Sequence, residues 1–163
     1  MRHTLVTRWF DDFHVSERFA LPTRTVTAEL IRAFAEATGD AQPLRSSPED
    51  HRALGYDCAL AHAFLATMQT VACFGAFPFL LDDSLVSVLD QSSRCLRPVL
   101  EGDILSPVLQ VVELEPGRGT GIVTLRSTVH NQAKALVLVG AQRWLMRGRP
   151  PITAFPSVDT AGR

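Results

Sequence analysis

The chain has 163 residues, of which 46% are hydrophobic and 20% charged, a balance typical of a folded domain rather than a disordered one. Its 16 basic and 17 acidic residues leave a net charge of −1, which excludes the strongly basic surface of a non-specific nucleic-acid-binding protein. The most apolar stretch, residues 59–81, is interrupted by polar, glycine and proline residues, so we expect a buried helix there rather than a membrane span. The three cysteines lack C-x-x-C spacing and the N-terminus lacks a secretory signal, so we expect a reduced, cytoplasmic compartment.

The first predicted elements are a strand and two helices. A strand over residues 18–26 is expected to join a sheet formed later in the chain. A helix follows between Thr27, a favourable N-cap, and Gly39, which suits the left-handed residue that ends a helix. A second, short helix is predicted from Ser47, another N-cap followed by a proline, to Gly55.

A third helix and four strands complete the predicted domain. The helix, from Ala63 to about Phe77, is apolar nearly all round, so we expect most of its faces to be buried. The strands, rich in β-branched and aliphatic residues, are predicted at 85–99, 103–114, 120–130 and 135–146. The turn segments EPGRGTG and NQAK have hairpin chemistry, so the strands should be antiparallel. The expected fold is α+β, with an antiparallel sheet wrapped around a long buried central helix, and residues 148–163 form an irregular, proline-rich tail.

The loop between the first two helices is the first candidate site. Asp40 follows directly after Gly39, and Pro43 restricts the loop two residues before Arg45. A carboxylate held on a restricted loop between two helices is a common way to present a catalytic base. Such a base normally works with a second group that transfers a proton, and the residue held out after the proline is an arginine.

The order of these elements resembles the MaoC-like hot-dog hydratases, the (R)-specific enoyl-thioester hydratases and dehydratases. The resemblance covers residues 9–147 and is carried by the segments WFDDFHVSERF, TRTVTAELIRAFAEATGDAQPL, ALAHAFLATM, LRPVLEGDIL and VHNQAKALVLVG. It implies that residues 1–147 form one hot-dog domain. It also implies a reversible hydration of a 2-enoyl thioester to a 3-hydroxyacyl thioester, without a metal or another cofactor.

The site motif departs from the family pattern at three positions. Where the family has Asp-x-Asn-Pro-x-His, this chain has Asp40, Gln42, Pro43 and Arg45. The acid and the proline are kept, the amide is one methylene longer, and the histidine is replaced by arginine. Elsewhere, Ala63 stands where the family has a glycine after the Ala-His pair.

The resemblance assigns roles to these positions. Asp40 and the residue at 45 would form the proton-transfer pair, and the Gln42 amide would hold the water or the acid. The backbone N–H of Ala63 would donate to the thioester oxygen as it gains negative charge, with Ala61, His62 and Pro43 nearby as substrate-binding residues.

Arg45 leaves three possibilities open, because a guanidinium stays protonated and cannot relay a proton as an imidazole does. Arg45 could orient water or substrate while Asp40 alone moves protons. Another histidine could have taken over, and His51 and His62 are the nearest in sequence. His51 is expected on the surface, and the family often has the histidine at position 62 without using it as the base. The third possibility is a site that binds acyl thioesters without hydrating them.

Three functional hypotheses follow. The first is an acyl-CoA or acyl-carrier-protein hydratase/dehydratase that works through Asp40. The second is a non-catalytic hot-dog subunit that binds acyl thioesters or stabilises an active partner. The third is a hot-dog thioesterase, which usually places a carboxylate on or just before the buried helix, where residues 63–77 have none. We expect a homodimer or a paralogue heterodimer, since a single hot-dog domain leaves one edge of its sheet open.

Overall fold

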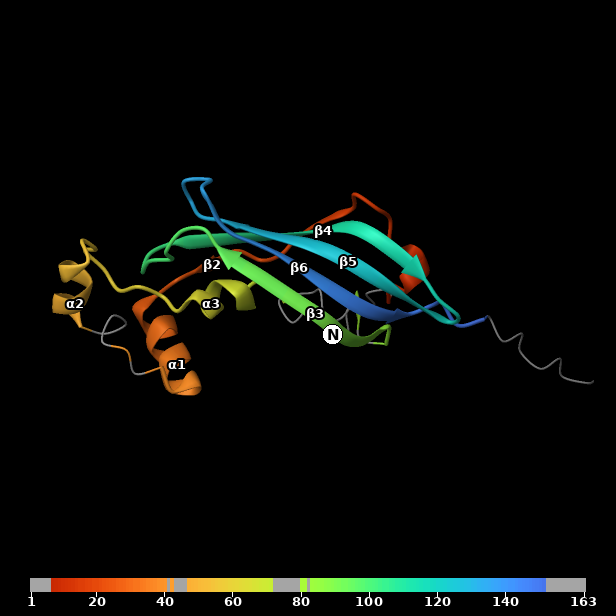
Figure 1. The fold of residues 1–163 in the computed structure, drawn as a ribbon, viewed down its shortest axis with the longest axis horizontal. Coiled ribbons are helices and arrows are strands. Elements are labelled where there is room, and N and C mark those ends of the chain that lie inside the picture. Colours follow the sequence, from red (N-terminus) through yellow and green to blue (C-terminus); the bar gives the residue numbers. More distant parts are fainter. Residues whose placement is uncertain (1–6, 41, 43–46, 72–79, 82, 152–163) are drawn as a thin grey trace, which may run out of the picture.

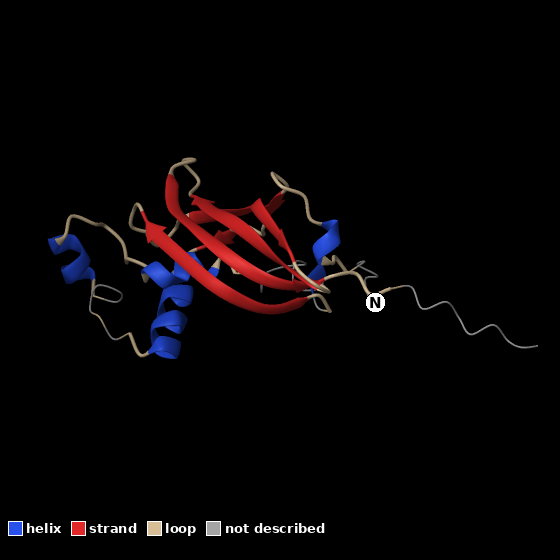
Figure 2. Cartoon of the chain, turned by 45° about the vertical axis from the view of Figure 1, so that its right-hand side comes forward, coloured by secondary structure: helices blue, strands red, loops and turns tan. Residues whose placement is uncertain are grey.

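The computed structural model describes residues 7–40, 42, 47–71, 80–81 and 83–151 (Figure 1). Its elements are η1 (Phe10–Asp12), β1 (Arg18–Ala20), β2 (Arg24–Thr25), α1 (Ala28–Thr38), α2 (Pro48–Ala53), α3 (Ala63–Met68), β3 (Leu85–Cys95), β4 (Ile104–Pro116), β5 (Thr120–His130) and β6 (Leu136–Arg147). The strands form a six-stranded antiparallel sheet in the order β1-β4-β5-β6-β3, and β2 also pairs with β4. Figure 2 shows α1 and α3 beneath one end of this sheet. The sheet curving over α3 confirms the predicted α+β hot-dog fold.

The long strands agree with the sequence prediction, and both predicted hairpins are present. In the first turn the N–H of Gly117 donates to the carbonyl oxygen of Thr120 over 2.8 Å. In the second, the Asn131 side chain accepts from the backbone N–H groups of Ala133 and Ala135. Lys134 in this turn has a φ of 59°, a left-handed conformation that glycine adopts more easily.

The predicted N-terminal strand joins the sheet in two pieces rather than one. Both β1 and β2 pair with β4, and the break between them contains Pro22. Proline has no backbone N–H to give to a ladder, so an uninterrupted strand through this position is disfavoured. The N–H of Leu21 still donates to the carbonyl oxygen of Pro107, which keeps the segment on the sheet through the break.

The caps of the first two helices are those predicted. Thr27 accepts a hydrogen bond from the N–H of Leu30, and Gly39 ends α1 with a φ of 71°. Ser47 accepts from the N–H of Asp50 at the start of α2. These capping interactions satisfy N–H groups that would otherwise lack a partner at the first turn.

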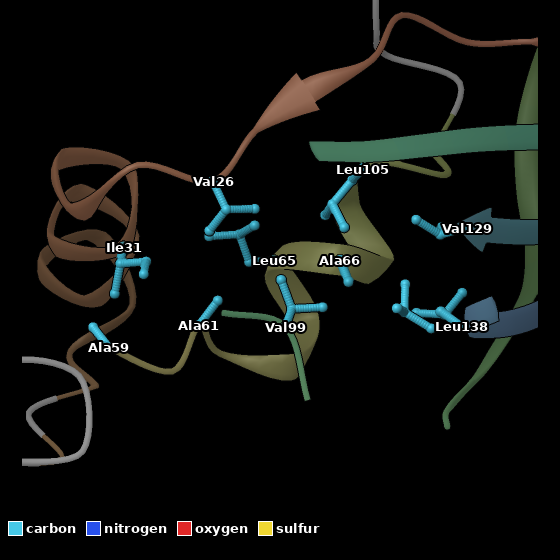
Figure 3. Packing of buried hydrophobic residues seen from close by; sticks show 11 residues of the cluster. Val26, Ile31, Ala59, Ala61, Leu65, Ala66, Val99, Leu105, Val129 and Leu138 are labelled. Atoms are coloured by element: carbon cyan, nitrogen blue, oxygen red, sulfur yellow. The ribbon is translucent and has the colours of Figure 1, made fainter. Parts of the chain in front are cut away.

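The inner face of the sheet carries the core in two clusters. One surrounds Trp144 and includes residues near η1, where the Phe10 ring lies directly against the backbone of Gly121. The other cluster, drawn in Figure 3, contains Ile31 of α1, Leu65 of α3 and Leu138 of β6. This second cluster fixes α1 and α3 relative to each other, and therefore also the loops that leave α1 and enter α3.

The third helix is shorter than predicted. It ends at Met68, whereas the prediction extended it to about Phe77; residues 72–79 lie outside the described part. Gln69 and Thr70 end it, because the Gln69 amide donates to the carbonyl oxygen of Leu65 and the Thr70 hydroxyl donates to that of Thr67. The prediction that most faces are buried is also wrong at Phe64, whose exposed fraction is 62% in this single chain.

Candidate active site

The end of α1 presents Asp40. Gly39 adopts the left-handed conformation, and the N–H of Asp40 then donates to the carbonyl oxygen of Ala35 over 2.9 Å. This hydrogen bond is of the kind that closes a helix C-terminus, and it fixes the direction in which the Asp40 side chain leaves the backbone. The N–H of Gln42 lies 3.4 Å from Asp40 Oδ1. The Asp40 side chain is 11% exposed, so this carboxylate lies largely out of bulk water.

The start of α3 presents His62. The segment before it is held to the chain that follows β3, since the N–H of Ala61 donates to the carbonyl oxygen of Val99 and Leu60 forms a bridge with Leu100. His62 is the N-cap of α3, and its Nδ1 accepts a hydrogen bond from the N–H of Phe64 over 3.0 Å. The imidazole therefore has a fixed position at the first turn of the helix.

Two aromatic rings flank this imidazole. The Phe64 ring stacks on it with a centroid separation of 5.3 Å, and the Phe34 ring of α1 lies 5.6 Å away on a tilt. Phe34 belongs to the helix that ends just before Asp40, so the same packing brings the two functional side chains together. The His62 side chain keeps an exposed fraction of 28%, which leaves it open to a ligand or to water.

Asp40 and His62 form the candidate pair. Their Oδ2 and Nε2 atoms lie 3.8 Å apart, which is too long for a direct hydrogen bond but short enough for one water to contact both at about 2.8 Å. Because Nδ1 of His62 accepts the Phe64 N–H, the neutral ring must carry its proton on Nε2. The carboxylate of Asp40, a hydrogen-bond acceptor, therefore faces the Nε2–H of His62, a hydrogen-bond donor.

A hollow of about 320 Å³ lies at the start of α3, lined by the two chain neighbours of His62 but not by His62 or Asp40 themselves. It is lined by Ala61, Ala63 and Ala66, by the segment 95–99, and by Val137. The lining is mostly apolar, with the Arg97 side chain as its charged member, and its size is within the range of small-molecule sites. Nothing in the described residues accepts from the N–H of Ala63, at the first position of α3, so this donor is available at the edge of the cavity.

The structure brings together five of the residues predicted for the site. Asp40 and Gln42 lie at the end of α1, and Ala61, His62 and Ala63 lie at the start of α3. Pro43 and Arg45 lie outside the described residues. Sequence reasoning placed His62 near the substrate and left open that it or His51 had replaced the family histidine; of the two, the structure places His62 opposite Asp40.

Two other polar side chains are placed differently from the prediction. His51 was expected on the surface, yet its exposed fraction is 7%, and neither ring nitrogen has a partner among the described residues. Asp103, in the turn before β4, would ordinarily be a solvated turn acid, yet it is 8% exposed. Its carboxylate accepts from the N–H of Leu100 and from the Gln132 amide, so it ties the turn before β4 to the turn after β5.

Within the described ranges, no three histidine, cysteine or acidic side chains are grouped as metal ligands. No helix in these ranges is long and apolar enough to cross a membrane.

Comparisons with known proteins agree with this fold. Residues 14–139 match the family model described as "FAS1-like, dehydratase domain region". The UPF0336 protein of Streptomyces avermitilis is 33% identical over 126 residues, which are 75% of this chain and 84% of that protein. The MaoC-like dehydratase of Rhodospirillum rubrum superposes with a TM-score of 0.75, covering 88% of this chain and 99% of that one at 23% identity. The HadBC complex, a 3R-hydroxyacyl-ACP dehydratase from Mycobacterium tuberculosis, gives a TM-score of 0.68 at 26% identity, covering 80% and 96%.

The sheet and helices define the class: a single hot-dog domain whose fold is similar to that of the MaoC-like dehydratase of Rhodospirillum rubrum. More specifically, the chain belongs to the family of the FAS1-like dehydratase domain region, since that model matches well over half of its length.

Proposed function

We propose that this protein is an acyl-thioester hydratase/dehydratase that interconverts a 2-enoyl thioester and a 3-hydroxyacyl thioester, with CoA or an acyl-carrier protein as the carrier. The observation that carries the proposal is the 3.8 Å approach of Asp40 and His62, together with a largely apolar hollow that Ala61 and Ala63, the chain neighbours of His62, line. Membership of a dehydratase family supports it. As a carrier-dependent enzyme it would work in the cytoplasm.

In the hydration direction, Asp40 acts first as a base and then as an acid. The carboxylate takes a proton from a water held between Oδ2 and Nε2, while the water oxygen bonds to the β-carbon of the substrate. The electron pair of the carbon–carbon double bond moves to give an enolate whose charge lies on the thioester oxygen. Asp40 then returns the proton to the α-carbon, so one carboxyl group accounts for both proton transfers.

His62 supports this cycle as a neutral donor. Its Nδ1 is engaged by the N–H of Phe64, so the nitrogen that faces Asp40 is the Nε2 that carries the proton of the neutral ring. Its Nε2–H orients the water toward Asp40. The N–H of Ala63, at the cavity edge, supplies a donor for the thioester oxygen. This division of roles replaces the aspartate–histidine relay that the family motif implies, with Arg45 left to orient the water or the substrate.

The proposal is tested by hydration of crotonyl-CoA and of longer enoyl-CoAs by the wild-type protein. Asp40→Asn should lower the rate by about 10²–10⁴-fold, because it removes a positioned acid/base while keeping the shape. Glu36→Gln, which neutralises an exposed carboxylate on the helix that precedes Asp40, is the matched control and should keep the wild-type rate. Wild-type release of free CoA without hydration would instead support the thioesterase hypothesis.

A second candidate function is a non-catalytic acyl-thioester-binding or partner-stabilising subunit. It is favoured by the engaged Nδ1 of His62, which leaves the site without an imidazole relay. This function predicts that wild-type protein binds enoyl-CoA but does not hydrate it, and that Arg45→His gains hydration. Hydration by the wild-type protein that is lost in Asp40→Asn would exclude it.

The proposed assembly is a homodimer, with a paralogue heterodimer as the alternative. β3 forms the edge of the sheet, and it exposes Val86, Val88 and Leu89 by 45–47% in the single chain. Pairing this edge with the same edge of a second copy would extend the sheet and cover these side chains. Sedimentation of the purified protein as a stable monomer at micromolar concentration would argue for a different partner chain.

A further inference from the structure

The outer face of the sheet is divided into a basic half and an acidic half. This face is the one opposite the core, and α1 and α3 lie on the other side (Figure 1). Along β5 the even-numbered residues face outward, since the odd-numbered ones from 121 to 129 are buried. Residues that are paired across neighbouring strands form rows that run across the sheet, and the outward side chains of one row lie side by side.

The basic half contains three arginines on three strands. Arg18 of β1 pairs with Gln110, which pairs with Arg126 of β5, so these guanidinium groups lie in one row. Arg94 of β3 pairs with Val139 in the next row. In the described ranges no carboxylate lies within ion-pair distance of any of the three. Two surface hollows of about 360 and 240 Å³ lie on either side of Arg126, the first reaching Arg94 and the second Arg18.

The acidic half begins one row further along the strands. Glu113 of β4 pairs with Thr124, and Asp90 of β3 pairs with Arg143 in the same row. A β-bulge between Val111 and Glu113 shifts the alternation so that Glu113 faces outward with Gln110 rather than inward. Glu115 lies in the row after that.

Arg143 is the one basic residue among these acids, and it does not balance them. Its guanidinium lies 2.7 Å from Glu115. The hydrogen bond and the charge of Glu115 raise the pKa of Arg143, and the charges of Asp90 and Glu113 raise it further. Three carboxylates around one guanidinium leave this half of the face negatively charged, next to a half with three arginines.

We propose that the outer face binds the outer face of a second copy of this chain, related by a two-fold axis that runs across the strands between the Gln110–Arg126 and Glu113–Thr124 rows. Such an axis reverses the strand direction and keeps each strand opposite its own copy. Arg126 of one copy then lies opposite the row that holds Glu113 of the other, and Arg94 comes near the row that holds Asp90. The basic half of each copy therefore covers the acidic half of the other copy, so the interface contains this contact twice.

The pattern of charge favours a second copy over an unrelated anionic protein. An anionic partner that covered the face would match the arginines but would be repelled by Glu113, Glu115 and Asp90. A second copy matches both halves at once. This contact is separate from the β3 edge, so it joins two edge-paired dimers into a tetramer or, without edge pairing, two monomers into a dimer. It does not depend on the proposed catalytic activity.

The test is charge reversal followed by sedimentation velocity in low salt. Arg126→Glu and Glu113→Arg should each halve the assembly mass, because each puts like charges opposite each other in both copies of the contact. An equimolar mixture of the two variants should regain the wild-type mass. In a mixed pair, one contact keeps the native charges of Arg126 and Glu113, and the other contact has both charges reversed, so opposite charges meet in both. The double variant should also regain it. Arg32→Glu, an equal charge change on the exposed side of α1, is the control and should leave the mass unchanged.

Wild-type assembly through these charges should also weaken as salt rises from about 0.05 to 1 M, because the Debye length shortens to about 3 Å. The proposal is overturned if both reversals leave the mass unchanged in low salt, or if each lowers it and neither the mixture nor the double variant restores it. Unchanged mass combined with saturable, Arg126-dependent binding of an acidic protein would assign the arginine half to that other partner. Circular dichroism of each variant confirms that a change in mass is not a loss of fold.

Discussion

Gln142 connects the sheet to the end of α3, and its replacement should have a large effect on stability. Its side-chain amide donates to the carbonyl oxygen of Thr70 over 2.7 Å, and its side-chain oxygen accepts from Trp144 Nε1 over 3.0 Å. All three residues have exposed fractions of 1% or less. Gln142→Met keeps a similar volume and removes both hydrogen bonds, so it leaves a buried acceptor and a buried donor behind.

The expected loss follows from those two groups. Each buried polar group that loses its hydrogen bond costs about 1–3 kcal/mol, so Gln142→Met should lower the free energy of unfolding by about 2–6 kcal/mol. For a chain of this size, about 2–4 °C per kcal/mol converts this to a fall in Tm of about 10 °C. Thermal unfolding followed by circular dichroism measures the shift.

Leu125→Met is the matched control, because Leu125 is fully buried on the neighbouring strand and has no polar contact to lose. A volume-conserving change of this kind should cost less than about 1.5 kcal/mol. If Gln142→Met were no less stable than Leu125→Met, the hydrogen bonds of Gln142 would not be what holds the turn after α3 to the sheet.

Three further outcomes are expected. Gly39→Ala should cost about 1–2 kcal/mol in urea unfolding, because the φ of 71° is unfavourable for alanine although nothing lies within 4 Å of an added methyl group; an unchanged midpoint would contradict this. Burial alone raises the pKa of Asp12, but hydrogen bonds from Trp9 and Arg149 outweigh it and hold the pKa below its ordinary value. The ionised carboxylate therefore stabilises the fold above the ordinary pKa of aspartate, and this stabilisation is lost as the pH falls through the lowered pKa. Asp12→Asn should be less stable than the wild type at pH 7 and indistinguishable from it at the lowest pH. Alkylation of Cys95, which is exposed and lines the cavity, should abolish turnover in the wild type but not in Cys95→Ser, and equal inactivation of both would place the reactive thiol elsewhere.

The local signals in the sequence predicted most of the fold. Caps such as Thr27 and Ser47, and the left-handed Gly39, act through neighbours within a few residues, so their consequences can be read without the tertiary structure. The hairpins and long strands are similarly local. The length of α3 was not predictable in this way, because Gln142, 72 residues further along the chain, bonds the turn at Thr70 that follows the helix.

The sequence predicted the individual site residues but not the approach of Asp40 to His62. Asp40 is presented by a helix end, which is a local feature. Its approach to His62 depends on the packing of Phe34 and Leu65 in the second core cluster, and on the Val99 carbonyl that holds Ala61. A burial error of the same origin affected His51, since charged neighbours in the sequence suggested exposure that the tertiary structure does not give.

Hydration of crotonyl-CoA by Asp40→Asn, compared with Glu36→Gln under the same conditions, tests the central claim most directly. Both substitutions remove one carboxylate and conserve size, so they differ only in whether the lost group faces His62 or solvent. We predict that Glu36→Gln retains the wild-type rate and Asp40→Asn loses about 10²–10⁴-fold of it. Equal rates for the two variants, with wild-type protein active, would contradict the assignment of Asp40 as the proton-transfer group.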